Sequence, residues 1–191
     1  MLNIKPLTRF PLEVHEIFLN FYYTWYSEVA PKMAWSNAHF ATELLPKEQE
    51  FLSGYLPMKA GGVEIYYIQP NSTTSAHIDR GRKTALQIPI DVPLDSYTFC
   101  SKTRNIDDHS AFTHMKFDPR KEKFGIINNP GKWFFRWEPE KFDTHSMDVP
   151  VLSSVEHPHG GTNNSDVVRI FISVSYHIGI DEVAEYYKDW M

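Results

Sequence analysis

Short β-rich runs, separated by turn residues, fill the chain from Gly62 to Ile178 and constrain its fold more than any other feature. Apolar, β-branched and aromatic residues make up six of these runs: GVEIYYIQP, KTALQIPIDV, SYTFCS, KFGIINN, KWFFRWEP and VVRIFISVSYHI. Proline, asparagine, aspartate and glycine lie between them, and no helical pattern intervenes. Strands that follow one another without crossover helices pair antiparallel, so the pattern predicts a sandwich or jelly roll.

Helical patterns lie on both sides of this β-rich zone. Apolar residues recur at helical spacing in VHEIFLNFYYTWY, in LPKEQEFLSGYL and in the final DEVAEYYKDWM. The sequence therefore predicts a mainly β fold of the α+β class in one domain, residues 1–191. Its expected parts are a helical N-terminal region (1–61), a jelly-roll core (62–180) and a C-terminal helix (181–191).

Charge and cysteine content exclude several classes of protein. The formal net charge is −5, without a run of Lys or Arg, which argues against a nucleic-acid partner because such binding needs clustered cations. The single cysteine, Cys100, excludes an internal disulfide and a four-thiolate zinc site. No stretch of about 18 apolar residues occurs, so we expect a cytoplasmic protein without a membrane partner.

Histidines at two places in the β-rich zone could bind a metal. His77 and Asp79 stand two apart, so in an extended segment both side chains leave the same face and can converge on one ion. The tripeptide alone is common in surface turns. A second cluster, with His157 and His159, begins 78 residues after Asp79. One more histidine from it would complete a set of two histidines and one carboxylate, which is diagnostic of non-haem Fe(II) oxygenases.

Arg169 interrupts the apolar strand that follows the second histidine cluster. With a period of two, Arg169, Phe171, Ser173 and Ser175 share one face of this strand and alternate with aliphatic residues. A guanidinium on an inward face needs an anion, because an unpaired buried charge costs several kcal/mol. A bound dicarboxylate is a suitable anion, since the planar fork matches a carboxylate. We expect a tight hairpin to bring His159 beside this arginine.

The HID tripeptide at 77–79 and HPHGGTNNSDVVRIFISVSY, with an arginine ten residues after His159, together resemble the Fe(II)- and 2-oxoglutarate-dependent dioxygenases. The resemblance covers about residues 62–178, and HIDRGRKTALQIPID is similar to the aspartyl/asparaginyl and prolyl hydroxylase branches. It implies a double-stranded β-helix, the jelly-roll architecture that cupins share. It also implies the following site residues: His77, Asp79 and His159 as iron ligands, Arg169 as the clamp of the cosubstrate carboxylate, and Ser173, Tyr67 (or Tyr66) and Gln87 as further cosubstrate contacts.

The activity that the resemblance implies is hydroxylation of a C–H bond in an amino acid, a peptide side chain or a small metabolite, with release of succinate and CO2. Its cofactors are Fe(II) and 2-oxoglutarate, and dioxygen is consumed. Three points depart from the family pattern or stay open. His157 is the alternative distal ligand, the segment 132–154 is either a lid or an ordinary loop, and a cupin-like jelly-roll binding module, with or without metal, is the alternative function.

Overall fold

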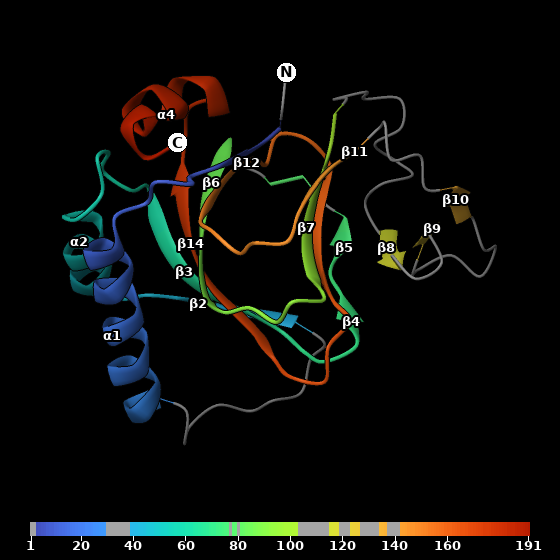
Figure 1. The fold of residues 1–191 in the computed structure, drawn as a ribbon, viewed down its shortest axis with the longest axis horizontal. Coiled ribbons are helices and arrows are strands. Elements are labelled where there is room, and N and C mark those ends of the chain that lie inside the picture. Colours follow the sequence, from blue (N-terminus) through green and yellow to red (C-terminus); the bar gives the residue numbers. More distant parts are fainter. Residues whose placement is uncertain are drawn as a thin grey trace.

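Two facing antiparallel sheets, with helices on the outside of one of them, form the body of the protein (Figure 1). The structure is a computed structural model. It describes residues 3–29, 39–76, 78–79, 81–102, 115–118, 123–126, 134–136 and 142–191. Both the predicted succession of strands and the predicted flanking helices are present.

The larger sheet has six strands in the order β1-β12-β6-β14-β3-β2, and every neighbouring pair is antiparallel. Their bounds are β1 (Ile4–Pro6), β12 (Val151–Ser154), β6 (Thr84–Asp91), β14 (Arg169–Tyr176), β3 (Gly62–Ile68) and β2 (His39–Glu43). The N-terminal region, expected to be helical, thus supplies both edge strands. β1 and β2 have only three and five residues, too few to produce a clear period-two signal.

A second sheet faces the first and has the order β11-β7-β13-β4. Its strands are β11 (Phe142–His145), β7 (Ser96–Ser101), β13 (His159–Asn163) and β4 (Ser72–Thr73). A third, short sheet follows the order β10-β9-β8-β5. Its strands are β10 (Phe134–Arg136), β9 (Lys123–Ile126), β8 (Met115–Asp118) and β5 (Ser75–Ala76).

The segment 132–154, for which a lid or a loop was expected, takes part in both main sheets. β11 pairs with β7 in the smaller sheet, and β12 pairs with β6 in the larger one. The described residues from Phe142 to Ser154 therefore belong to the sandwich and do not form a lid.

Helices cover the outer face of the larger sheet (Figure 1). α1 (Leu12–Val29) packs against β6, and α2 (Pro46–Ser53) lies beside it. Pro46 stands at the start of α2, where its fixed φ and missing N–H are harmless. At the other end of the chain, α4 (Ile180–Tyr186) and the 3-10 helix η5 (Lys188–Trp190) contact one another, and α4 packs against β12. None of the described helices is long and apolar enough to span a membrane.

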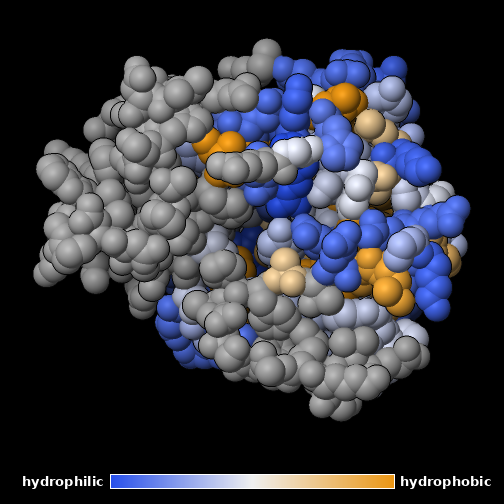
Figure 2. All heavy atoms as spheres, turned by 180° about the vertical axis from the view of Figure 1, so that it is seen from behind, coloured by the Kyte–Doolittle hydropathy of each residue, from blue (hydrophilic) through white to orange (hydrophobic). Residues whose placement is uncertain are grey.

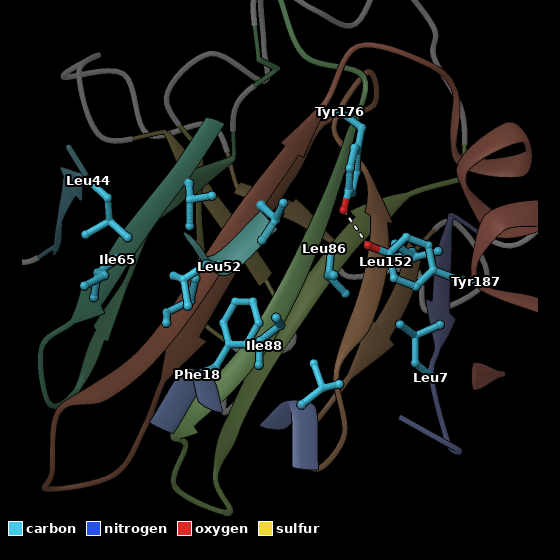
Figure 3. Close-up of a cluster of buried hydrophobic side chains, with 14 of the residues drawn as sticks. Leu7, Phe18, Leu44, Leu52, Ile65, Leu86, Ile88, Leu152, Tyr176 and Tyr187 are labelled. Atoms are coloured by element: carbon cyan, nitrogen blue, oxygen red, sulfur yellow. Dashed lines mark hydrogen bonds between the residues drawn. The ribbon is translucent and has the colours of Figure 1, made fainter. Parts of the chain in front are cut away.

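Residue parity divides the larger sheet into an apolar outer face and a polar inner face. On β14, Ile172 and Val174 belong to the main core cluster beneath the helices. Phe18 of α1 points into the same cluster (Figure 3). Alternate residues of the same strand, among them Arg169 and Ser173, point between the sheets. Because successive strand side chains leave opposite faces, one strand both anchors the helices and lines an internal pocket.

The C-terminal elements join this core through a buried pair of tyrosines. Tyr176 of β14 and Tyr187 after α4 bring their hydroxyl oxygens to 2.5 Å, the dashed contact in Figure 3. Hydrophobic side chains that reach the surface are scattered among hydrophilic ones in the view from behind (Figure 2). The larger cluster of buried apolar side chains lies beneath the helices, whereas polar and apolar side chains together line the space between the sheets.

Candidate functional site

A pocket of about 410 Å³, its open mouth included, lies between the two main sheets. Both sheets line it: the larger one with Gln87, Arg169 and Ser173, the smaller one with Thr98 and His159. All five side chains are buried. So many buried polar side chains around one pocket are uncommon, because buried polar groups must find partners, so the pocket is the foremost candidate for a functional site.

Arg169 lines this pocket and is 0% exposed. Its Nη1 donates to the carbonyl oxygens of Tyr97 (2.7 Å) and Thr162 (3.2 Å), and its Nη2 donates to Thr98 Oγ1 (2.7 Å) and contacts Met147 Sδ. Its Nε has no hydrogen-bond partner among the described residues, and no described carboxylate pairs with it. Burial lowers the pKa of Arg169 to about 9. Neutral groups thus orient the guanidinium, and no acidic side chain among the described residues neutralises its charge.

His159 is 4% exposed and lines the same pocket. Its Nδ1 lies 2.9 Å from the carbonyl oxygen of His157, which can only accept, so Nδ1 carries the proton of the neutral ring. In that tautomer Nε2 is a lone-pair donor, and it faces Asp79 Oδ2 at 3.5 Å. A nitrogen and an oxygen so placed can share one ion, and the backbone carbonyl behind the ring is the usual support of a metal-binding histidine.

His157 does not face the pocket. Its Nδ1 lies 3.0 Å from the carbonyl oxygen of Ser101 and 3.3 Å from the side-chain nitrogen of Asn3. Of the two histidines in this cluster, the structure brings His159 to Asp79.

His77, the remaining predicted ligand, lies outside the described residues. The described residues alone contain no group of three His, Cys, Asp or Glu side chains that could hold a metal. His159 and Asp79 are thus the described part of the predicted set.

Arg82 binds Asp79 and closes the mouth of the pocket. Its Nε donates to Asp79 Oδ2 at 2.5 Å, and its Nη1 donates to Glu64 Oε2 at 3.2 Å and Ser175 Oγ at 3.0 Å. Its Nη2 donates to Tyr66 Oη at 3.0 Å. Burial lowers the pKa of Arg82, but Tyr66 and the two carboxylates raise it by more, so the net shift is upward. Arg82 therefore remains a cation, and its charge is matched by acids.

A stack of four side chains forms one wall of the pocket and joins its two arginines. Arg82 Cζ lies 5.9 Å from the centroid of the Tyr66 ring, and Tyr66 stacks on Phe171 at 5.2 Å and an interplanar angle of 12°. Arg169 Cζ lies 5.0 Å from the centroid of Phe171. Tyr66 and Phe171 are direct partners on β3 and β14, so the pairing register of the sheet places the stack. Guanidinium groups over aromatic faces are mutually stabilising.

The other predicted cosubstrate residues divide by strand face. Gln87 and Ser173 are direct partners on β6 and β14, and both line the pocket. Gln87 Oε1 accepts a hydrogen bond from Thr98 Oγ1 at 2.9 Å. The expected role of Tyr67 as a cosubstrate contact is corrected: its side chain points to the outer face of β3, into the core cluster that also contains Tyr22. Its neighbour Tyr66 points inward, because adjacent residues of a strand leave opposite faces.

β13 and β14 are not a hairpin, contrary to expectation. β13 pairs with β7 and β4 in the smaller sheet, whereas β14 lies between β6 and β3 in the larger one. The connection between them crosses from one sheet to the other. His159 and Arg169 reach one pocket because the sheets face each other, not because the two strands are paired.

Asn163 and Gly161 fix this crossover. The Asn163 side-chain amide donates to the carbonyl oxygens of Ile68, Gln69 and Val167 at 3.0, 3.2 and 2.7 Å. At Gly161 a Cβ atom would come within 2.9 Å of Arg169 Nη1. A side chain at this position would collide with the guanidinium, so the smaller sheet needs glycine where Arg169 packs against it.

An outer cleft adjoins the mouth of the pocket on the far side of Arg82. It has a volume of about 830 Å³, open solvent included, and is lined by Glu43, Glu64, Asp79 and Ser175 among others. Tyr66 and Arg82 line both spaces. These two side chains are therefore the partition between the inner pocket and the outer cleft.

Sequence reasoning missed Arg82, Thr98 and Met147. The sequence contains one indication of the role of Arg82, because this residue follows a predicted metal-binding carboxylate, Asp79, by three positions. Thr98 and Met147 meet the guanidinium of Arg169 only through the facing of distant strands, and their sequence surroundings give no sign of it.

Comparison with known proteins shows the fold. No protein-family model matches the chain, and no curated protein sequence matches it. Among solved structures, AviO1 from Streptomyces viridochromogenes Tue57 is similar with a TM-score of 0.51 at 11% identity, covering 91% of this chain and 89% of that one. The non-heme alpha ketoglutarate dependent carbocyclase SnoK from nogalamycin biosynthesis has a TM-score of 0.50 at 14% identity, covering 90% and 85%.

A cupin domain of an XRE family transcriptional regulator from Enterobacter cloacae is also matched, with a TM-score of 0.39 at 11% identity, covering 74% of this chain and 99% of that one. At identities this low the comparisons concern architecture alone. The likeness to AviO1 and SnoK, together with the two facing antiparallel sheets of this chain, confirms the predicted fold: the chain is a mainly β protein with a double-stranded β-helix.

Proposed function

We propose that this protein is an Fe(II)- and 2-oxoglutarate-dependent dioxygenase. It hydroxylates a C–H bond of an amino acid, a peptide side chain or a small metabolite and releases succinate and CO2. His77, Asp79 and His159 hold the iron, and Arg169 holds the carboxylate of 2-oxoglutarate that is farther from the metal. The protein acts in the cytoplasm.

Arg169 is the observation that carries the proposal. A fully buried guanidinium with no described carboxylate beside it is costly, by roughly several kcal/mol, unless an anion arrives from outside. It lines the same pocket as His159, so an anion bound there is close to the candidate metal ligands. A dicarboxylate with a 2-oxo group matches both ends, because one carboxylate pairs with the fork and the other end chelates a metal.

The donor set fits a divalent iron ion as far as it is described. His159 presents Nε2 and Asp79 presents Oδ2 at a mutual distance of 3.5 Å, and the carbonyl oxygen of His157 fixes the tautomer. One histidine and one carboxylate, with His77 as the third ligand, would supply the donor set by which non-haem oxygenases hold Fe(II). When bound, the iron and 2-oxoglutarate supply the oxidising chemistry.

The chain's own residues have positioning and shielding tasks. Arg169 is held in one orientation by Tyr97, Thr98 and Thr162, so it binds the cosubstrate carboxylate without reorganising. Gln87 and Ser173 lie beside it and offer an amide and a hydroxyl. The stacked rings of Tyr66 and Phe171 form one wall of the pocket and shield the Arg169 side of it from water. The substrate approaches through the outer cleft, which contains Asp79.

The structural neighbour SnoK is an alpha ketoglutarate dependent enzyme, which supports the proposal. Cupin domains have the same type of fold, so the fold alone does not decide between a dioxygenase and a binding module. A cupin-like binding module would have no use for a buried, unneutralised arginine in the pocket that His159 also lines, and Arg169 therefore favours the dioxygenase.

The test is turnover of the cosubstrate without a known substrate. Purified protein is incubated with Fe(II), ascorbate and 2-oxoglutarate in air, and succinate is measured by NMR, with Arg169→Met and Asp79→Ala as matched variants. We expect slow succinate formation by the natural protein that needs both iron and dioxygen and is abolished in both variants. Tight binding of metal and 2-oxoglutarate without any succinate would contradict the dioxygenase and favour the binding module.

A further inference from the structure

Arg82 makes several polar contacts at the mouth of the pocket, next to the candidate metal ligand Asp79. Its guanidinium donates to both carboxylates at the pocket mouth, Asp79 and Glu64, and to the hydroxyl oxygens of Tyr66 and Ser175. A weaker contact of 3.4 Å joins Nη1 to Ser173 Oγ. The Arg82 side chain is 14% exposed, so these bonds form largely away from water.

The bond to Asp79 is made to the oxygen that faces the histidine. Arg82 Nε lies 2.5 Å from Asp79 Oδ2, and His159 Nε2 lies 3.5 Å from the same atom. The backbone N–H of Asp79 donates to the carbonyl oxygen of Val155 at 3.1 Å, which fixes the main chain at this point. With the main chain held and one oxygen bonded, the carboxylate is turned toward His159 before any metal is bound.

We propose that Arg82 is the positioning residue of the metal site: it orients Asp79 toward His159 and thereby sets metal affinity without touching the metal. The inference rests on the proposed function, because it takes Asp79 and His159 as metal ligands. Partners that hydrogen-bond to a ligand typically change metal affinity by about 10- to 100-fold when they are removed.

The two arginines of the pocket then have separate tasks. Arg169 has no described carboxylate partner and is oriented by carbonyl and hydroxyl oxygens, as a receptor for an incoming anion requires. Arg82 already lies between Asp79 and Glu64, at 2.5 and 3.2 Å, and its charge is matched. Arg82 therefore serves the metal end, and Arg169 serves the carboxylate end.

Arginine suits this task better than lysine. The guanidinium uses Nε for Asp79, Nη1 for Glu64 and Nη2 for Tyr66, so a single planar group fixes three partners at once. An ammonium group at the same place keeps the charge but has no fixed fork. Arg82→Lys is thus expected to restore the electrostatic part of the effect and only part of the alignment.

The experiment measures two affinities by calorimetry, with Mn(II) as the metal probe and 2-oxoglutarate as the anion probe. Arg82→Ala is expected to weaken Mn(II) binding by about 10- to 100-fold, with Arg82→Lys between it and the natural protein. Affinity for 2-oxoglutarate at saturating Mn(II) should change by less than about threefold. Lys5→Ala, which removes a half-buried lysine on β1 that pairs with Asp181, is the control and should change neither affinity.

The variants also separate orientation from general damage to the pocket. Glu64→Gln loosens the far side of Arg82 but leaves its bond to Asp79, so it should weaken Mn(II) binding much less than Arg82→Ala does. Equal losses in Glu64→Gln and Arg82→Ala, or an unchanged Mn(II) affinity in Arg82→Ala and Arg82→Lys, would overturn the role of Arg82. If the natural protein binds no Mn(II), or binds it equally well in Asp79→Ala, the proposed function itself fails.

Discussion

His159 Nε2 lies 3.5 Å from Asp79 Oδ2, although 80 residues of chain separate the two side chains. The backbone brings them together: Asp79 donates its N–H to the carbonyl oxygen of Val155, just before the strand that begins at His159. The pair is therefore a product of the sheet architecture. It links the part of the chain that contains HID to the part that contains the crossover to Arg169.

Replacing each histidine of the second cluster by alanine in turn tests which of the two is the metal ligand. His159→Ala should lose metal binding by at least about 100-fold, because it removes a ligand. His157→Ala should retain metal binding within a few-fold and lose about 1 kcal/mol of stability, since it removes hydrogen bonds with Asn3 and Ser101. Electron paramagnetic resonance of added Mn(II) measures the bound fraction in each variant. Equal losses in both variants would contradict the assignment.

The buried charge of Arg169 predicts a dependence of stability on pH. Its pKa is lowered by burial to about 9, so above that pH the folded protein binds fewer protons at this site than the unfolded protein does. The free energy of unfolding should then rise with pH, by about 1 kcal/mol between pH 8 and pH 10, relative to Arg169→Met. Urea unfolding of both proteins at the two pH values gives this difference. A difference that is constant with pH would count against a strongly desolvated charge.

Gly161→Ala tests whether the smaller sheet positions Arg169. The added Cβ would lie within 2.9 Å of Arg169 Nη1 and 3.1 Å of Ile68 Cδ1, so the guanidinium must shift. Overpacking of this kind costs about 1 to 3 kcal/mol of stability, and we expect affinity for 2-oxoglutarate to fall by about tenfold. Gly179→Ala is the matched control, since nothing lies within 4 Å of its added Cβ. Calorimetric titration should find its affinity unchanged; an equal loss in both variants would refute the argument.

Asn163→Ala tests the crossover between the sheets. This amide satisfies three carbonyl oxygens, those of Ile68, Gln69 and Val167, and its removal leaves buried acceptors without their donor. We expect a loss of about 3 kcal/mol or more in the free energy of unfolding, measured by urea titration. Asn164→Ala is the comparison: that side chain has an exposed contact with Asp95 and accepts one hydrogen bond from Thr162 Oγ1 at 3.2 Å, so we expect a smaller loss of about 1 kcal/mol. Comparable losses at both positions would show that the crossover is not fixed by Asn163.

Local patterns were sufficient to predict most of the fold. The run at 169–176 predicted β14 and its two faces, because the alternation of side chains between the faces of a strand is visible in neighbouring residues. The short edge strands β1 and β2 escaped prediction, since three and five residues carry little periodic signal and owe their conformation to pairing with β12 and β3. Such strands are determined by tertiary contacts rather than by their own sequence.

The candidate site was predictable where a motif lies in continuous sequence and unpredictable where it depends on register. Asp79 and His159 were expected together and lie together, whereas Tyr67 was taken for a pocket residue that its neighbour Tyr66 replaces. A shift of one residue moves a side chain to the other face, and the sequence did not fix that register. Of the contacts of Arg82, only the one with Asp79, three residues earlier, is local in sequence; Glu64 and Tyr66 come from β3, and their approach depends on the fold.

The most direct measurement of the central claim is an anaerobic absorption spectrum of the metal-free protein after addition of Fe(II) and then 2-oxoglutarate. A 2-oxo acid chelated to Fe(II) gives a weak visible charge-transfer band. The proposed site predicts this band in the natural protein, its absence in Asp79→Ala, and a need for far more 2-oxoglutarate in Arg169→Met. Stoichiometric iron binding without the band at saturating 2-oxoglutarate would contradict the account and assign the pocket to a cupin-like metal site.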